Sequence, residues 1–144
     1  MKTIDLAKEI KTLLPFFRQM VREKIKIKFE TIGESFLIKG DSGLLGQALI
    51  NIVKNAAQSI RSEGYIEIRV SEGKNNIELI VSNNGCRIDD KTASQLFTPF
   101  FTTKPEGKGI GLTLVREVLT RHSAEFSLAT ESDGITRFKI FFNK

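Results

Sequence analysis

Residues 47–60 read QALINIVKNAAQSI and lie within a segment, 43–62, whose apolar residues recur at helical spacing. The apolar stripe comprises Leu45, Leu49, Ile52, Val53, Ala56 and Ile60. An adjoining stripe carries uncharged amides, at Gln47, Asn51, Asn55 and Gln58. Asparagine is a mediocre helix former, and a merely solvated face would carry lysine and glutamate. The row of amides therefore indicates a binding role for this helix.

Strand patterns lie on both sides of the helix. Two segments before it and four after it have the composition of strands, with alternation of apolar and polar residues clearest in IKIKFE and in the two last segments, and the four later ones read as two hairpins. The segments are IKIKFE (25–30), FLIKGD (36–41), YIEIRV (65–70), IELIVS (77–82) and the two halves of EFSLATESDGITRFKIFF (125–142). This order predicts an α+β fold, a two-layer sandwich with one mixed, mostly antiparallel sheet of about five strands and about three helices on one face.

The remaining segments are predicted from helical spacing and from the proline, capping and glycine residues that mark the ends of helices. Residues 4–23 show helical spacing interrupted by Pro15, so we expect a helix that breaks or restarts there. Asp41 or Ser42 can cap the helix that follows. Residues 91–106 look largely irregular, and GKGIGLTLVREVLTRH (107–122) is a glycine-rich turn that opens a helix.

Composition narrows the function classes. The 144 residues, 40% of them hydrophobic, fit one globular domain. No apolar run approaches the roughly 18–20 residues of a membrane span, and the charged start is unlike a secretory signal, so we expect a cytoplasmic domain without membrane contact. Cys86 is the only cysteine in the sequence, which excludes an internal disulfide. His122 is the only histidine, which argues against a His-rich metal site. The net charge of +5 is dispersed, which favours a solvated surface over a nucleic-acid partner.

The glycine-rich turn suits a phosphate group. Gly107, Gly109 and Gly111 precede a helix, where unpaired N–H groups and close backbone approach favour an anion. In isolation a structural turn would explain them. A phosphate chain needs a cation, however, and Mg²⁺ prefers oxygen ligands while it keeps several waters. The amides at Asn51, Asn55 and Gln58 fit one magnesium ion beside a phosphate chain.

Five motifs occur in order: QALINIVKNAAQSI, VSNNGCRID, LFTPFFTTK, GKGIGLTLVREVL and DGITRFKIFF. Together they resemble the catalytic ATP-binding domain of sensor histidine kinases, within the GHKL-type ATPase family that includes DNA gyrase and the heat-shock chaperone ATPases. LFTPFFTTK is typical of histidine kinases rather than of the gyrase, mismatch-repair or anti-sigma branches. The resemblance implies a protein-histidine kinase, with residues 1–24 as a connecting helix from a missing dimerisation domain and residues 25–144 as the catalytic domain.

The resemblance also implies site residues and cofactors, ATP and Mg²⁺. Asn55 matches the magnesium-binding asparagine, Asn51 supports the phosphates, and Thr136 approaches the adenine. Phe97, with Phe100 and Phe101, matches a phenylalanine box. The implied nucleotide-binding set is Asn51, Asn55, Gln58, Asn83, Gly85, Ile88, Phe97, Thr102, Thr103, Lys104, Gly107, Lys108, Gly109, Ile110, Gly111, Leu112 and Thr136. Asn55 is the metal ligand, and no catalytic side chain is assigned.

Two positions depart from the family's first glycine box, which reads Asp-x-Gly-x-Gly. Asn83 replaces the aspartate that accepts from the adenine amino group, and Arg87 replaces the second glycine. The Asn83 oxygen can still accept, in a neutral bond that is weaker than a charged one, or its nitrogen can donate to a ring acceptor or to the oxygen of guanine. Arg87 can reach the nucleotide or a partner carboxylate, or face solvent.

The resemblance leaves three functions open. The first is a kinase domain that donates the γ-phosphoryl group to a histidine on a separate dimerisation domain, in the same full-length chain or in trans, with a response regulator downstream. The second is a nucleotide-poor, pseudokinase-like interaction module, motivated by Asn83 and Arg87. The third is an anti-sigma-type serine kinase, which the phenylalanine box disfavours. His122 at a helix end is expected to interact with the helix dipole rather than to accept phosphate. The full-length protein is either free or membrane-anchored.

Overall fold

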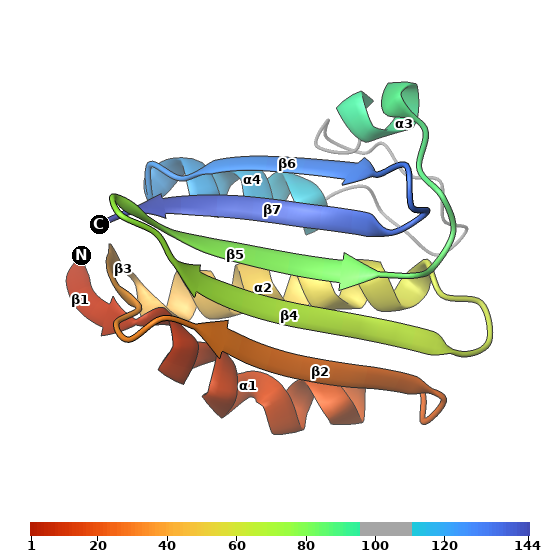
Figure 1. Ribbon diagram of the computed structural model, residues 1–144, viewed down its shortest axis with the longest axis horizontal. Coiled ribbons are helices and arrows are strands. Elements are labelled where there is room, and N and C mark those ends of the chain that lie inside the picture. Colours follow the sequence, from red (N-terminus) through yellow and green to blue (C-terminus); the bar gives the residue numbers. More distant parts are fainter. Residues whose placement is uncertain (96–110) are drawn as a thin grey trace.

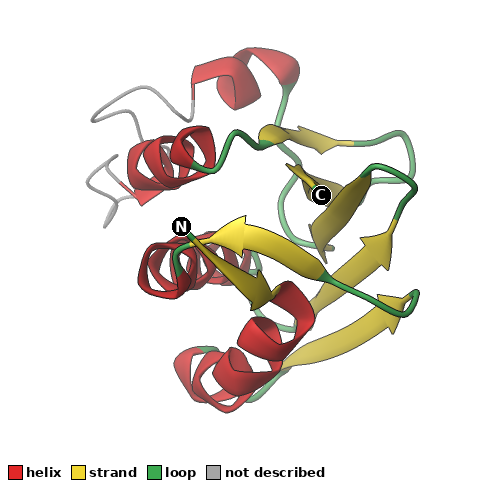
Figure 2. Cartoon of the chain, turned by 90° about the vertical axis from the view of Figure 1, so that its left-hand side faces the viewer, coloured by secondary structure: helices red, strands yellow, loops and turns green. Residues whose placement is uncertain are grey.

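The computed structural model describes residues 1–95 and 111–144. Its elements follow the chain as β1 (Lys2–Asp5), α1 (Leu6–Met20), β2 (Ile25–Ile32), β3 (Leu37–Gly40), α2 (Ser42–Gln58), β4 (Gly64–Glu72), β5 (Asn76–Asn83), α3 (Asp90–Gln95), α4 (Gly111–Arg121), β6 (Glu125–Thr130) and β7 (Thr136–Asn143). A five-stranded sheet forms one layer, and the long helices α1, α2 and α4 form the other (Figures 1 and 2). The predicted α+β sandwich is confirmed.

The strands of the main sheet lie in the order β2-β4-β5-β7-β6. β2 and β4 pair in parallel, whereas the β4–β5, β5–β7 and β6–β7 pairs are antiparallel, so the sheet is mixed as predicted. The prediction of one sheet was wrong in part, because β3 pairs with β1 in a separate two-stranded sheet. A strand as short as β3 can leave the main sheet when another short segment satisfies its backbone.

Alternation along the central strands builds the core. On β5, Ile77, Leu79, Val81 and Asn83 point inward, and on β7 the inward series is Phe142, Ile140, Phe138 and Thr136. Both series therefore end in a polar residue at the same end of the sheet, where Asn83 and Thr136 are direct cross-strand partners. Two buried polar side chains in adjacent strands need partners, and this end of the sheet is where the candidate site lies.

The N-terminal segment belongs to the same core. β1 was not predicted, and Pro15 does not break α1, which is continuous from Leu6 to Met20. Pro15 is exposed, and so is Lys11, whose carbonyl loses its helical N–H partner and can bind water instead. The helix is held by its buried face, on which Leu6 and Ile10 are 0% exposed and Phe17 is 1% exposed. Whether residues 1–24 also lead from a dimerisation domain stays a prediction.

The start of α2 is tied to the end of α4. Asp41 caps α2 as predicted, since its carboxylate accepts from Leu44 N–H at 2.9 Å. The backbone N–H of Asp41 donates to Nε2 of buried His122 at 3.0 Å, and His122 Nδ1 donates to the Val118 carbonyl at 2.8 Å. Because both ring nitrogens are engaged, His122 joins two helices of the core and is not placed to accept a phosphoryl group.

The short helix α3 (Asp90–Gln95) overlaps the start of the stretch 91–106 that was predicted to be largely irregular, so that prediction was wrong for residues 91–95. Asp89 precedes the helix, and its carboxylate accepts from Thr92 N–H at 2.7 Å, which lowers the pKa of Asp89. An N-terminal cap of this kind satisfies a backbone donor that the helix itself leaves unpaired. No helix in residues 1–95 or 111–144 has the length and hydrophobicity to cross a bilayer.

Glu72 anchors the turn after β2. Its Oε1 accepts from Glu34 N–H at 2.9 Å and Ser35 N–H at 3.2 Å, and its Oε2 accepts from Lys144 Nζ at 3.1 Å. These hydrogen bonds lower the pKa of Glu72 from 4.5 to about 2, and the bond from the Glu34 N–H makes the largest contribution. A lowered pKa in the folded state adds stability above the ordinary pKa, and that stability is lost as the pH falls through the folded value.

We therefore expect Glu72→Gln to lower the thermal midpoint at neutral pH and the midpoints of the two proteins to converge as the pH falls from about 5 to about 2. Thermal unfolding followed by circular dichroism over that range measures the difference. Glu23→Gln, at an exposed position, controls for the loss of one surface charge. Parallel profiles for Glu72→Gln and wild type would mean that the carboxylate does not anchor this turn.

Candidate functional site

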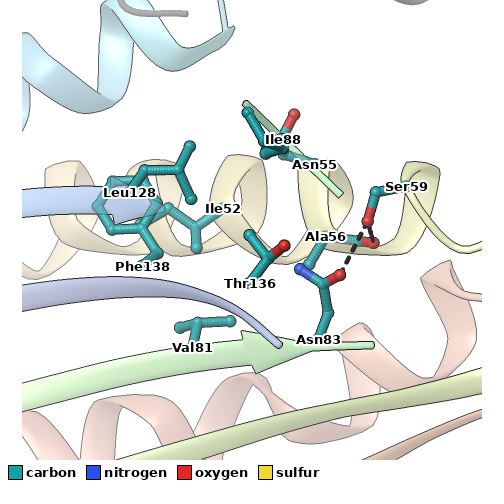
Figure 3. A pocket seen from close by; sticks show the side chains of 10 residues that line it. All are labelled: Ile52, Asn55, Ala56, Ser59, Val81, Asn83, Ile88, Leu128, Thr136 and Phe138. Carbon is teal, nitrogen blue, oxygen red and sulfur yellow. Dashed lines mark hydrogen bonds between the residues drawn. The ribbon is translucent and has the colours of Figure 1, made fainter. Parts of the chain in front are cut away.

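A pocket opens between α2 and the ends of the central strands (Figure 3). Most of its wall is apolar, and its polar groups are two amides and two hydroxyls. Its lining residues are Ile52, Asn55, Ala56, Ser59, Val81, Asn83, Ile88, Leu128, Thr136 and Phe138. Its volume of about 20 Å³ has room for about one water molecule. A ring-sized ligand must therefore spread the walls, and the combination of apolar walls with a few polar groups is typical of an organic-ligand site.

Asn83 forms the polar end of the pocket and is 5% exposed. Its Oδ1 accepts from the backbone N–H of Gly85 at 2.9 Å and lies 3.0 Å from Ser59 Oγ (Figure 3). Ser59 Oγ also lies 2.7 Å from the Ala56 carbonyl, and its single proton serves one of the two acceptors at a time. The backbone N–H of Gly85 can only donate, so it fixes which end of the Asn83 amide carries the oxygen.

The turn after β5 is seated on the end of α2. The N–H of Cys86 donates to the Ser59 carbonyl at 2.8 Å. A Cβ at Gly85 would lie 2.4 Å from Ser59 Oγ and 2.5 Å from the Ser59 carbonyl oxygen, closer than real Cβ contacts. Gly85 is thus required for close approach of two backbones, and it holds Asn83 against α2. Arg87, two residues on, is exposed and does not line the pocket.

Two threonines link the opposite side of the pocket. Thr136 is 2% exposed, and its Oγ1 lies 2.6 Å from Thr130 Oγ1. Thr130 Oγ1 in turn accepts from Ile88 N–H at 2.8 Å, which fastens the loop that carries Ile88 to β6. The prediction placed Asn83, Ile88 and Thr136 at one site, and the structure brings these three residues together. Ser59 and Thr130 were missed, since a single serine or threonine carries no distinctive sequence signal.

The amide side chains of α2 differ in their burial and in their distance from the pocket. Asn55 is half-buried and lines the pocket, whereas Gln58 is exposed and lies outside the lining. Asn51 is half-buried, and its Nδ2 donates to the Gln47 carbonyl at 3.0 Å. A Cβ built on Gly111, the first residue of α4, would lie 3.5 Å from Asn51 Oδ1. Asn51 and Gly111 are therefore neighbours, as a shared phosphate-binding region requires.

The remaining predicted residues fall into two groups. Leu112 is 8% exposed and packs in the core, and it does not line the pocket. Several predicted residues lie outside the described part of the chain, namely Phe97, Phe100, Phe101, Thr102, Thr103, Lys104, Gly107, Lys108, Gly109 and Ile110. Their roles stay predictions.

The side chains around the pocket can be compared with the oxygen ligands that a magnesium ion requires. In residues 1–95 and 111–144, no three His, Cys, Asp or Glu side chains gather into a group that could hold a metal. A cation here would take the Asn55 amide oxygen and complete its shell from water and ligand oxygens, which is the mode that Mg²⁺ prefers. The residues present fit magnesium bound together with a phosphate chain.

Comparison with known proteins agrees with this geometry. The family described as histidine kinase-, DNA gyrase B-, and HSP90-like ATPase matches residues 40–144. Sporulation kinase A of Bacillus subtilis (strain 168) is 32% identical over 111 residues, which make up 77% of this chain. The chain spans 18% of the length of that curated relative.

Solved structures share the whole fold. The catalytic domain of histidine kinase ThkA, in a nucleotide-free form, matches with a TM-score of 0.89 and 27% identity over 99% of this chain and 95% of that chain. Histidine kinase ThkA in complex with response regulator protein TrrA matches with a TM-score of 0.83 and 24% identity, over 99% of this chain and 41% of that chain. The N-terminal strand and helix lie within these alignments.

Proposed function

This chain belongs to the histidine kinase-, DNA gyrase B- and HSP90-like ATPase family as a catalytic domain of the sensor histidine kinase type, and from that premise we propose that it binds ATP with Mg²⁺ and donates the γ-phosphoryl group to a protein histidine. The acceptor histidine lies on a separate dimerisation domain, to which residues 1–24 connect. A proposal of a scaffold without nucleotide, based on Asn83 and Arg87, has no support in the comparisons.

The observation that carries the proposal is the placement of three groups around one pocket. Asn83 and Thr136 form a buried polar end suited to the edge of a base, and Ile52, Val81 and Phe138 give it apolar walls. Asn55 lies in the same lining, on the helix whose preceding turn brings Asn51 next to the start of α4. A nucleotide with its base in the pocket and its phosphates along α2 would contact Asn83 with its base, and then Asn55 and Asn51 with its phosphates.

The residues of the site act by binding and orientation. When bound, magnesium would offset the charge of the phosphate chain, and Asn55 would supply one of its oxygen ligands. The segment 43–62 contains no aspartate or glutamate, so α2 offers no general base to activate a water molecule. Phosphoryl transfer depends mainly on alignment and charge stabilisation, which this arrangement provides without a covalent intermediate. Transfer to a partner histidine is therefore favoured over hydrolysis.

The partners follow from the same premise. The dimerisation domain supplies the acceptor histidine, and a response regulator receives the phosphoryl group afterwards, as suggested by the solved complex of ThkA with TrrA. We expect the domain to work in the cytoplasm, where ATP is available, whether or not the full-length protein is membrane-anchored.

Thermal unfolding with and without millimolar ATP and Mg²⁺ tests binding, and transfer of radiolabel from the γ-phosphoryl group of ATP to a supplied dimerisation domain tests the reaction. A ligand at a hundred times its dissociation constant should raise the free energy of unfolding by about 2.7 kcal/mol. The label should be stable in base and labile in acid, as phosphohistidine is. Binding without transfer to any histidine would contradict the kinase assignment, and a missing shift with every purine triphosphate would contradict nucleotide binding.

A further inference from the structure

The side-chain amide of Asn83 presents an unused donor to the pocket. Its oxygen is engaged by Gly85 N–H, whereas its Nδ2 has no hydrogen-bond partner among residues 1–95 and 111–144. In Figure 3 the nitrogen points away from Ser59 and toward the side of the pocket that holds Thr136. Among the described residues no fully buried side-chain nitrogen or oxygen lacks a hydrogen-bond partner, so Nδ2 is open to the solvent in the pocket although the residue as a whole is 5% exposed. A ligand in the pocket can therefore accept a hydrogen bond from Nδ2 of Asn83.

The orientation of this amide is held by its surroundings. A flip would place Nδ2 against the Gly85 N–H, so that two donors would face each other and the backbone N–H would lose its partner. Ser59 alone could accept from a flipped amide, and it cannot satisfy Gly85. Because Gly85 is itself fixed by its contact with the Ser59 backbone, Asn83 has no easy route to turn its oxygen into the pocket.

Thr136 can complement a ligand next to Asn83. It stands directly opposite Asn83 in the β5–β7 register, and its hydroxyl shares one hydrogen bond with Thr130. Thr130 already accepts from Ile88 N–H and keeps capacity to accept again, so Thr136 can donate to Thr130 and leave its own lone pairs to the pocket. The pocket then offers a donor at Asn83 beside an acceptor at Thr136.

We propose that Asn83 selects purine nucleotides whose base carries an exocyclic carbonyl, hypoxanthine or guanine, over adenine; this inference rests on the proposed function of the same site. Such a base presents a carbonyl oxygen beside a ring N–H, which matches the Asn83 donor and the Thr136 acceptor. Adenine presents an amino group beside an unprotonated ring nitrogen. Its amino group would face the Asn83 N–H, and two buried donors would lie against each other without an acceptor.

Isothermal titration of the wild-type protein with ITP, GTP and ATP in the presence of Mg²⁺ tests this selection. ITP is the matched probe, since its base differs from adenine only in the group that would meet Asn83 and in the ring proton beside it. We expect ITP to bind at least about tenfold more tightly than ATP, the effect of one mismatched buried hydrogen bond. In Asn83→Asp, one carboxylate oxygen keeps Gly85 N–H and the other faces the pocket as an acceptor, so the order should reverse.

The outcomes separate this inference from the proposed function. Tighter binding of ATP than of ITP by the wild type, or the same order in Asn83→Asp, would overturn the selection while nucleotide binding stood. Failure of all three triphosphates with both proteins would overturn both, provided that thermal unfolding shows both to be folded. GTP adds one amino group to the ITP base, so weak GTP beside tight ITP would support the selection and show a steric limit elsewhere in the pocket.

Discussion

Asn55→Ala will bind ATP about 10- to 100-fold more weakly than the wild type when Mg²⁺ is present, and equally well when the metal is removed with a chelator. The reason is that Asn55 brings an amide oxygen to the pocket, while no cluster of acidic, histidine or cysteine side chains in the described residues can replace it. Magnesium-dependent phosphoryl transfer should fall at least as far, because the same ion aligns the phosphate chain. Paired titrations with Mg²⁺ and with chelator measure the effect.

The matched control is Gln58→Ala. Gln58 is an amide on the same helix, three residues further on, but it is exposed and outside the pocket lining. Loss of a solvated amide should leave affinity within about twofold of the wild type, since surface substitutions away from a site usually change little. Equal losses in Asn55→Ala and Gln58→Ala, or a loss in Asn55→Ala that persists in chelator, would contradict a magnesium ligand at Asn55.

The polar end of the pocket was partly visible in the sequence. Alternation along β5 and β7 predicts inward apolar side chains, so inward Asn83 and Thr136 already mark an exception. The direction of the Asn83 amide could not be predicted, because it is set by Gly85 and by Ser59, which is 24 positions away in the chain. The sequence left both directions open, and only the packing of the turn against the end of α2 decides between them.

The fold was predicted best where one physical effect dominates. The apolar stripe of α2 and the strand patterns of β4 and β5 predicted these elements with starts within one residue, although the helix predicted for 43–62 ends four residues earlier, at Gln58. The N-terminal segment failed because local rules were overridden by packing. Pro15 argues for a break, but its side of the helix is solvated and the opposite side is buried. β1 has only four residues, and its pairing with β3 depends on a contact between distant segments.

Phe17→Ala will lower the free energy of unfolding by about 3–5 kcal/mol, the usual cost of removing a buried phenylalanine ring. Phe17 is 1% exposed on the inner face of α1, within the same hydrophobic core as residues of α2 and the sheet. Such a loss is a large part of the roughly 5–15 kcal/mol that stabilises a typical domain. Nucleotide affinity measured well below the midpoint of unfolding should be unchanged, since α1 contributes no residue to the pocket lining.

Phe16→Ala is the control that makes this test sharp, because it removes the same side chain from the adjacent position. Phe16 is 48% exposed, so its truncation should change stability by no more than about 0.5 kcal/mol. Denaturant unfolding of both variants gives the two differences under identical conditions. A Phe17→Ala protein as stable as Phe16→Ala would mean that α1 is only a connecting helix laid against the domain. A large difference would place residues 1–24 inside the cooperative unit, so that a fragment beginning at Ile25 should not fold independently.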